Sequence, residues 1–514
     1  MPNKFEVPAL IVHQWLDEWN GVDFKAGEHR KQPQPEFYMF SIKASYLRRL
    51  SDVYRRHADP DQPRSQDVAI QRFHEEIRSD EIKRFIHGGF PWSSLADRQK
   101  QSDEYKDLRM PGWLPTSIVA NILPVSAIRN GKTIQKNDAI RIEKTENQVA
   151  KLILPENFLD ENWNPDVFPL EIIDGQHRLY AIDESADSLQ GNFEFPVVAF
   201  YDLDVTWRAY LFYTINIKPK KINTSLAYDL YPLLRIQDWL EKSQDGLLVY
   251  RETRAQEMTE VLWSHPKSPW QGRINMLGEK NGGDVTQAAF IRALLTSYIK
   301  RGSPLGGLFG DELHSKKGDI LEWSRTKQAA FLIFIWISLQ AAVEKSKELW
   351  AIDLRHAPMK QPKPGQKPIT DAAFAGPYTL LATDQGVRGI LQITNDMCFV
   401  AADQLQLSEW ILSDEFTNDG IDPAAITDAI NALHGKPVDA FLQKISAQLV
   451  AKFDWRLSSA PSLLQDVERR RAQMVFKGSS GYKELRSQLI DLLITSDDKE
   501  VGTTAKTVKE LLKY

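Results

Sequence analysis

The chain has 514 residues, of which 42% are hydrophobic and 26% charged, so its composition is that of a globular protein with room for a large core. The formal net charge of −5 excludes a basic character of the whole molecule, so any attraction to nucleic acid must come from local patches. The one cysteine, Cys398, excludes an intramolecular disulfide framework and a multi-cysteine zinc site, and it fits a reducing cytoplasm.

Two stretches bear on membranes and export. The beginning of the chain, "MPNKFEVPALIVHQWLDEW", carries acids among its apolar residues and lacks the basic-then-apolar layout of a secretory signal. The most apolar stretch, 329–343, is shorter than the roughly 20 residues that a bilayer-spanning helix needs, which favours a buried core helix. We therefore expect a cytoplasmic protein without a membrane partner.

Strands and helices are predicted to alternate over residues 37–235, after an N-terminal extension at 1–36. A helical pattern lies within 68–89, and another follows residue 174. The stretches that read as strands because of their β-branched and apolar residues are 114–123, 150–155, 170–174 and 195–203. The charged loop 129–148 predicts an extra hairpin or a lid.

The hydrophobic pattern changes past residue 235, where long amphipathic stretches predict helices. They are 232–245, 285–300, 326–348, 385–408, 422–452 and 483–495. This pattern predicts a mostly α-helical region over 236–514, with a possible division into two subdomains near 355–370. The predicted fold class is therefore α+β.

One short string stands out within "PLEIIDGQHRLYAIDE", residues 169–184. The predicted strand ends at Asp174, and Gly175 permits a tight turn into a helix whose free N–H groups favour an anion. Arg178 offers a planar fork of donors that suits phosphate oxygens, and His177 can donate to the same oxygens or exchange a proton. Gln176 can both donate and accept hydrogen bonds, as recognition of a base or sugar would require.

A purely structural interpretation of the string stays open. Asp174 suits a helix N-cap, and Arg178 suits an ion pair with Asp183 or Glu184 on the helix surface. Asp174 would repel phosphate directly, so its functional roles would be to hold a metal ion through water or to activate a hydroxyl.

The string resembles the DGQHR-domain family, which includes the DndB and DpdB proteins of DNA-modification gene clusters. More distantly it is similar to the ParB/sulfiredoxin superfamily, in which this strand-to-helix corner binds nucleotide phosphates. Flanking patterns at 68–89, 114–123 and 195–230 extend the resemblance to roughly 190 residues. The resemblance implies a ParB/sulfiredoxin-like α/β fold for the N-terminal domain.

The resemblance also implies a site for a nucleoside triphosphate, ATP or CTP, with Mg²⁺. Asp174 and His177 would be catalytic, and Asp174 with Asn216 would hold the metal, although the second acidic motif of ParB proteins is missing here. The residues implied to bind phosphate are Gly175, Gln176, Arg178, Gln71, Arg72, Asn216, Lys218, Lys220 and Lys221. The lysines form a basic turn after Asn216, in a segment that also contains Arg208 and no acid over 205–228. A solvated loop is the alternative for this turn.

A second basic segment lies at 469–486 and has a single acid, Glu484. Its cations are Arg469, Arg470, Arg471, Lys477, Lys483 and Arg486. Because Phe476 and Tyr482 are interleaved with them, the segment suits phosphates and stacked bases, so we predict that it binds DNA. A solvated helix face is the alternative.

Three hypotheses for function follow. The first is a nucleotide-binding NTPase of a bacterial DNA-modification or antiphage defence system, of the phosphorothioation or 7-deazaguanine type, whose nucleotide state controls DNA or partner binding. The second is a non-enzymatic DNA-binding regulator of such a system, and the third is a ParB-like nuclease. DNA, other proteins of the same operon and a second copy of the chain are the expected partners.

Overall fold

The computed structural model divides the chain into two compact units, Met1–Lys221 and Ile222–Tyr514, which we describe separately. The residues that the structure describes are 5–21, 32–53, 76–182 except 126, 130 and 146, 192–216, 224–229, 248–278, 285–310 except 303, 321–358 except 322, 369–410, and 422–512 except 477, 479 and 480. Helices and a large mixed sheet together confirm the α+β class.

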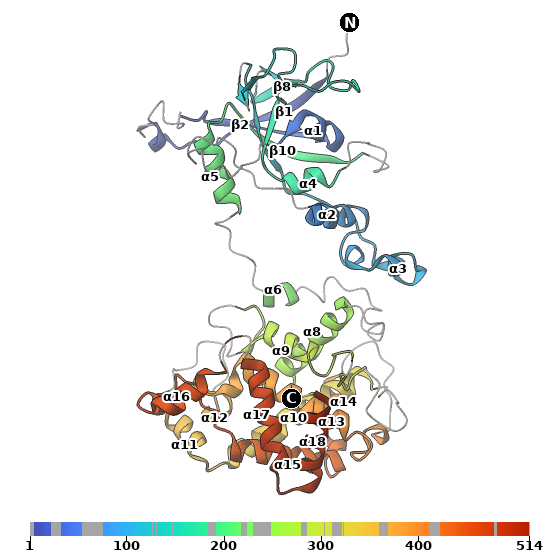
Figure 1. The fold of residues 1–514 in the computed structure, drawn as a ribbon, viewed down its shortest axis with the longest axis vertical. Coiled ribbons are helices and arrows are strands. Elements are labelled where there is room, and N and C mark those ends of the chain that lie inside the picture. Colours follow the sequence, from blue (N-terminus) through green and yellow to red (C-terminus); the bar gives the residue numbers. More distant parts are fainter. Residues whose placement is uncertain are drawn as a thin grey trace. The chain divides into compact units, whose positions relative to one another are not determined.

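The N-terminal unit is built on an eight-stranded sheet in the order β3-β9-β4-β10-β2-β1-β8-β7 (Figure 1). Its strands are β1 Glu6–His13, β2 Glu36–Lys43, β3 Ser51–Asp52, β4 Ile118–Ile122, β7 Arg141–Lys144, β8 Val149–Ile153, β9 Leu170–Asp174 and β10 Glu194–Tyr201. β4 and β10 run parallel, as do β3 and β9, whereas the other neighbours run antiparallel. The carboxyl ends of β4 and β10 therefore meet at one edge of the sheet.

Short helices and a hairpin complete this unit. They are α1 Ala44–Leu50, α2 Glu76–Gly88, α3 Asp97–Lys100, α4 Gln176–Tyr180, α5 Val205–Asn216, β5 Ile128–Arg129, β6 Lys132–Thr133 and the 3₁₀ turns η1 Asp17–Gly21, η2 Trp92–Ser94 and η3 Asp103–Leu108. The core forms where alternate strand residues such as Ala120, Ile172 and Val197 are fully or almost fully buried together.

The four predicted strands of this unit are confirmed as β4, β8, β9 and β10, because β-branched runs bounded by turns determined them locally. The expected extra hairpin is present as β5–β6, with β7 after it. Within the expected extension, β1 belongs to the sheet, since it pairs with both β2 and β8. Its apolar alternation is weak, which is why the sequence did not reveal it.

The C-terminal unit is mostly α-helical, as expected. Its helices are α6 Thr224–Asp229, α8 Leu248–Ser264, α9 Gln287–Leu295, α10 Arg325–Lys345, α11 Leu349–His356, α12 Ala372–Ala375, α13 Asp384–Val400, α14 Pro423–Leu433, α15 Pro437–Lys452, α16 Val467–Met474, α17 Gly481–Ile494 and α18 Lys499–Leu512. Short strands β11 Ile274–Asn275 and β12 Val285–Thr286 and the turns η7 Leu380–Ala382, η8 Leu407–Glu409 and η9 Pro461–Leu463 connect them. Helices before and after 355–370 share one core cluster, so the described residues show no subdomain break there. The predicted boundary at 235/236 lies outside the described residues.

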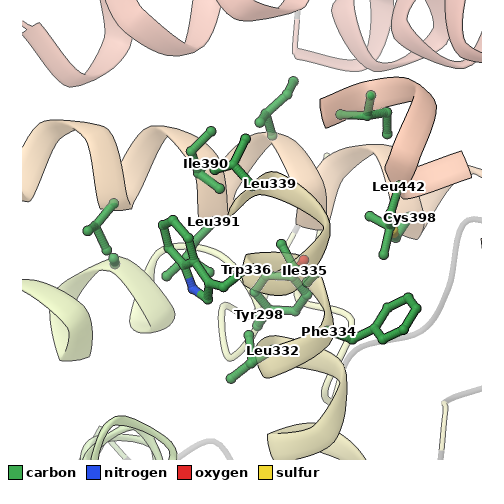
Figure 2. Close-up of a cluster of buried hydrophobic side chains, with 14 of the residues drawn as sticks. Tyr298, Leu332, Phe334, Ile335, Trp336, Leu339, Ile390, Leu391, Cys398 and Leu442 are labelled. Carbon is green, nitrogen blue, oxygen red and sulfur yellow. The ribbon is translucent and has the colours of Figure 1, made fainter. Parts of the chain in front are cut away.

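The core of this unit surrounds α10 (Figure 2). Trp336 of α10 is fully buried, and Leu391 of α13 and Leu442 of α15 belong to the same cluster. By length and composition α10 could cross a membrane, but 72% of its most apolar window is buried inside the protein. This burial is what the predicted core helix requires.

Candidate functional site

The turn between β9 and α4 forms a polar corner, defined here by Asp174, Arg178, Asn216 and Thr116. Gly175 makes the turn with φ of +96°, a left-handed conformation that favours glycine. A Cβ at this position would also come within 2.5 Å of Ile118 Cδ1. The backbone of the corner therefore requires glycine for two independent reasons.

Asp174 is the centre of the polar corner. Arg178 Nη2 lies 3.0 Å from Asp174 Oδ2, and Asn216 Nδ2 donates to Asp174 Oδ1 over 3.0 Å. Arg178 also donates to the backbone carbonyl and the hydroxyl of Thr116. Burial lowers the pKa of the Arg178 guanidinium, and the neighbouring Asp174 carboxylate acts in the opposite direction. Arg178, predicted to hold phosphate, is thus paired with a carboxylate in this structure.

His177 and Gln176 point away from solvent, with exposures of only 8% and 5%. The carbonyl of His177 accepts a hydrogen bond from Ser79 of α2, which ties α4 to that helix. Both side chains thus lie largely inside the protein, and their expected roles in catalysis and binding stay predictions. α4 itself has only five residues, Gln176–Tyr180, so its dipole adds little to anion binding.

Of the other residues implied to bind phosphate or metal, only Asn216 joins the polar corner. Gln71, Arg72, Lys218, Lys220 and Lys221 lie outside the described residues. Both oxygens of Asp174 already accept hydrogen bonds, and the described part of the chain contains no cluster of three His, Cys, Asp or Glu side chains for a metal ion. The corner, as it stands, does not fit direct coordination of Mg²⁺.

A buried ion triad lies behind the polar corner and was missed by the sequence analysis. Glu171 is 1% exposed and accepts from Arg208 of α5 and, over 2.7 Å, from Arg129 Nη2. Arg208, one of the four cations of the segment 205–228, is therefore an internal residue. The signal in the sequence was a charged residue inside the apolar run "LEIID".

The triad and the polar corner fix α5 at two points. Arg208 near its beginning bonds Glu171, and Asn216 at its end bonds Asp174, so both ends of β9 hold the same helix. This arrangement explains why α5 packs against β9.

The C-terminal basic segment is divided by the structure. Arg469, Arg470 and Arg471 are exposed on α16, and Lys483 is exposed on α17. Arg486 instead pairs with Asp396, which is 2% exposed, and Phe476 is buried against Phe453. Two residues of the predicted DNA surface are therefore structural, which corrects the expectation for them. Lys477 lies outside the described residues.

Taken together, the N-terminal unit is a mixed-sheet domain with a glycine-dependent polar corner between a central strand and a short helix. Residues 28–232 match the model of the DndB family, described as DNA-sulfur modification-associated, so this part of the chain is similar to that family. The match confirms the resemblance to DndB proteins and includes the segment 28–36, upstream of the predicted boundary. No curated protein and no solved structure matches the chain significantly.

The double requirement for Gly175 gives a testable result. We expect Gly175→Ala to lower the free energy of unfolding by about 2–4 kcal/mol, since it adds a contact with Ile118 to the cost of a left-handed backbone. Gly131→Ala is the matched control, because Gly131 has φ of +75° and open space around it. Urea unfolding should show a loss of only about 1 kcal/mol for the control. Equal losses in the two variants would contradict the role of the Ile118 contact.

Proposed function

We propose that this chain is a nucleotide-responsive, DNA-binding regulator of a DNA-sulfur modification system. The observation that carries the proposal is the polar corner, which lies inside the part of the chain that matches the DndB family. There the Arg178 guanidinium is paired with the Asp174 carboxylate, and phosphate oxygens could replace that carboxylate as its partner. The ParB/sulfiredoxin relation is part of this proposal, supported by the strand-corner-helix order at residues 170–180.

The proposed response is an exchange of partners. A triphosphate, ATP or CTP, would replace Asp174 as the partner of Arg178, because phosphate and carboxylate suit the same planar fork of donors. Since Asp174 also accepts from Asn216 at the end of α5, this exchange would alter the contact that fixes this helix. Nucleotide binding would in this way change the DNA-binding state of the protein.

Hydrolysis of the nucleotide is the second candidate. Asp174, with its side chain 18% exposed, is the group at the corner able to orient a water molecule. The burial of His177 and the double engagement of Asp174 favour binding over hydrolysis, so a regulator is preferred to an NTPase. The same geometry gives less support to a ParB-like nuclease, since the described residues bring no cluster of acids to Asp174. Any Mg²⁺ would be held by the phosphates.

DNA is the proposed partner, together with other proteins of the modification operon and a second copy of the chain, in the cytoplasm. Support for DNA comes from the exposed row Arg469, Arg470 and Arg471 on α16. Gel shifts across a salt series would count the phosphate contacts that these residues make.

Two substitutions at the polar corner test the nucleotide proposal. Arg178→Ala should weaken binding of the preferred nucleotide by about 1.5–3 kcal/mol, because it removes a charge-assisted contact. Asp174→Asn should strengthen binding several-fold, since it removes a repelling charge and frees Arg178. Calorimetry with the four triphosphates measures both effects, and assays of phosphate release with and without DNA separate regulator from NTPase. Weaker binding in both variants would indicate a purely structural corner, and no binding of any triphosphate to the wild type would overturn the proposal.

A further inference from the structure

An aromatic cleft lies in the N-terminal unit, away from the polar corner. It is a cavity of about 480 Å³. Its aromatic lining comes from four separate segments and consists of Trp15, Trp19, Phe37, Phe200, Trp207 and Tyr210. Trp19 and Tyr210 are 41% and 56% exposed, so their rings stand at the rim and remain open to a ligand.

The rings are arranged in pairs. Trp15 and Trp19 meet edge-to-face at 5.4 Å between centroids, and so do Trp207 and Tyr210 at 6.0 Å. Such pairs hold each ring at a fixed angle, and the exposed rings of Trp19 and Tyr210 are the ones on which a further planar group could stack. The volume of the cleft lies within the usual range for small-molecule sites and has room for a bicyclic base.

A polar cavity of about 350 Å³ adjoins the cleft and shares Leu203 with it. It lies where the parallel strands β4 and β10 end, and its lining includes Asp202 and Asp204. Ligands of α/β sheets bind outside the carboxyl ends of parallel strands, where an acidic residue often receives ribose hydroxyls. An aromatic cleft that suits a base is therefore next to an acidic cavity that suits the hydroxyls of its ribose.

The turn that carries Asp202 is held firmly. Asp202 has φ of +51°, and its N–H donates to the carbonyl of Ile122 over 3.0 Å. The buried Asn121 side chain accepts from the backbone N–H of Leu203 over 2.9 Å. A strained residue that its surroundings hold in place is typical of a binding turn.

We propose that the aromatic cleft and the adjoining cavity bind the nucleoside end of a ribonucleotide, with the base among the rings and the ribose hydroxyls on Asp202. The charges disfavour a phosphate-binding role for the cavity, because the three carboxylates of Glu171, Asp202 and Asp204 outnumber the two guanidinium groups of Arg129 and Arg208. The same negative charge disfavours the phosphates of a DNA backbone. DNA also has no 2′-hydroxyl to donate to Asp202. The site is separate from the polar corner and does not depend on the proposed nucleotide response there.

Adenosine is the probe, because it lacks the phosphates that the polar corner would hold. Calorimetry on the full chain should show saturable binding of adenosine that Trp19→Ala weakens about tenfold or more through the loss of stacking. Trp113→Ala is the matched control, since Trp113 is exposed in the same unit and outside the cleft, and it should leave binding unchanged. Arg178→Ala should also leave adenosine binding unchanged, because Arg178 lies at the polar corner and outside the lining of the cleft.

The ribose contact has its own test. Asp202→Asn should weaken adenosine about tenfold, because a charge-assisted hydrogen bond is lost, and leave 2′,3′-dideoxyadenosine unaffected. Asparagine tolerates a positive φ, so the turn should keep its shape. Absence of adenosine binding, equal binding of both nucleosides, or tighter binding of oligothymidylate than of adenosine would overturn the proposal. None of these outcomes bears on binding of triphosphate at the polar corner.

Discussion

Replacing Glu171 by alanine is expected to lower the free energy of unfolding of the N-terminal unit by about 3–5 kcal/mol. Glu171 is 1% exposed and lies between Arg208, 3% exposed, and Arg129, so its removal leaves two guanidinium groups without their carboxylate. A buried charge without its partner loses hydration and gains nothing in return. Burial lowers the pKa of the Arg208 guanidinium, and the negative charge of Glu171 acts in the opposite direction and favours the charged form.

Urea unfolding followed by circular dichroism measures this loss. The matched control is Lys132→Ala, which removes a lysine of the β5–β6 hairpin and so breaks its ion pair with Asp166. The side chains of Lys132 and Asp166 are both more than 60% exposed. An exposed pair contributes about 0–1 kcal/mol, so the control should change little. A loss below about 1 kcal/mol for Glu171→Ala would show that the triad is not needed for stability.

Trp336→Ala should destabilise the C-terminal unit by about 3–5 kcal/mol, since it leaves a large cavity in the core. Trp336 is fully buried, and its ring lies 5.1 Å from that of Trp270 and 6.3 Å from those of Phe290 and Phe374, centroid to centroid. Its indole Nε1 is buried without an acceptor among the described atoms. Trp336→Phe removes that unsatisfied N–H and keeps most of the ring contacts, so we expect a loss of only about 1–2 kcal/mol.

Cys398 reports on this unit alone. The thiol is fully buried in the same cluster, and burial raises its pKa to about 12, so a thiol reagent near neutral pH should react only after local unfolding. Labelling of Cys398 in a urea series should therefore shift to lower urea for Trp336→Ala and stay in place for Glu171→Ala. Equal effects of the alanine and phenylalanine variants at position 336 would contradict the cavity argument.

The two anchors of α5 connect stability to the proposed function. Arg208 holds one end of the helix to Glu171 in the interior, while Asn216 holds the other end to Asp174 at the surface. The interior anchor is buried, whereas the surface anchor joins the exposed Asn216 to the partly exposed Asp174, which a ligand can reach. A ligand at the polar corner would therefore act on one end of α5 while the triad keeps the other end in place.

Local sequence signals predicted much of the fold. Strands such as 170–174 and the core helix at 329–343 were recognised because β-branched runs and long apolar stretches favour their structures independently of distant residues. β1 was missed because its membership of the sheet depends on pairing with β2 and β8, which its own residues do not reveal.

Side-chain partners were harder to predict than elements. Arg178, Arg208 and Arg486 all appeared as available cations, yet each pairs with a carboxylate in the structure. The sequence separation between Arg486 and Asp396 is 90 residues, so no local pattern could indicate that pair. The aromatic cleft likewise assembles from four segments between residues 14 and 211.

The sequence by itself determined the glycine turn after β9, the polar residues around it and the helical character of the C-terminal unit, because these depend on neighbouring residues. Only the tertiary structure decided that Arg178 faces Asp174, that His177 is buried, and that six aromatic rings surround one cavity. The physical reason is that backbone preference acts over a few residues, whereas burial and charge pairing depend on groups that folding brings together from distant parts of the chain.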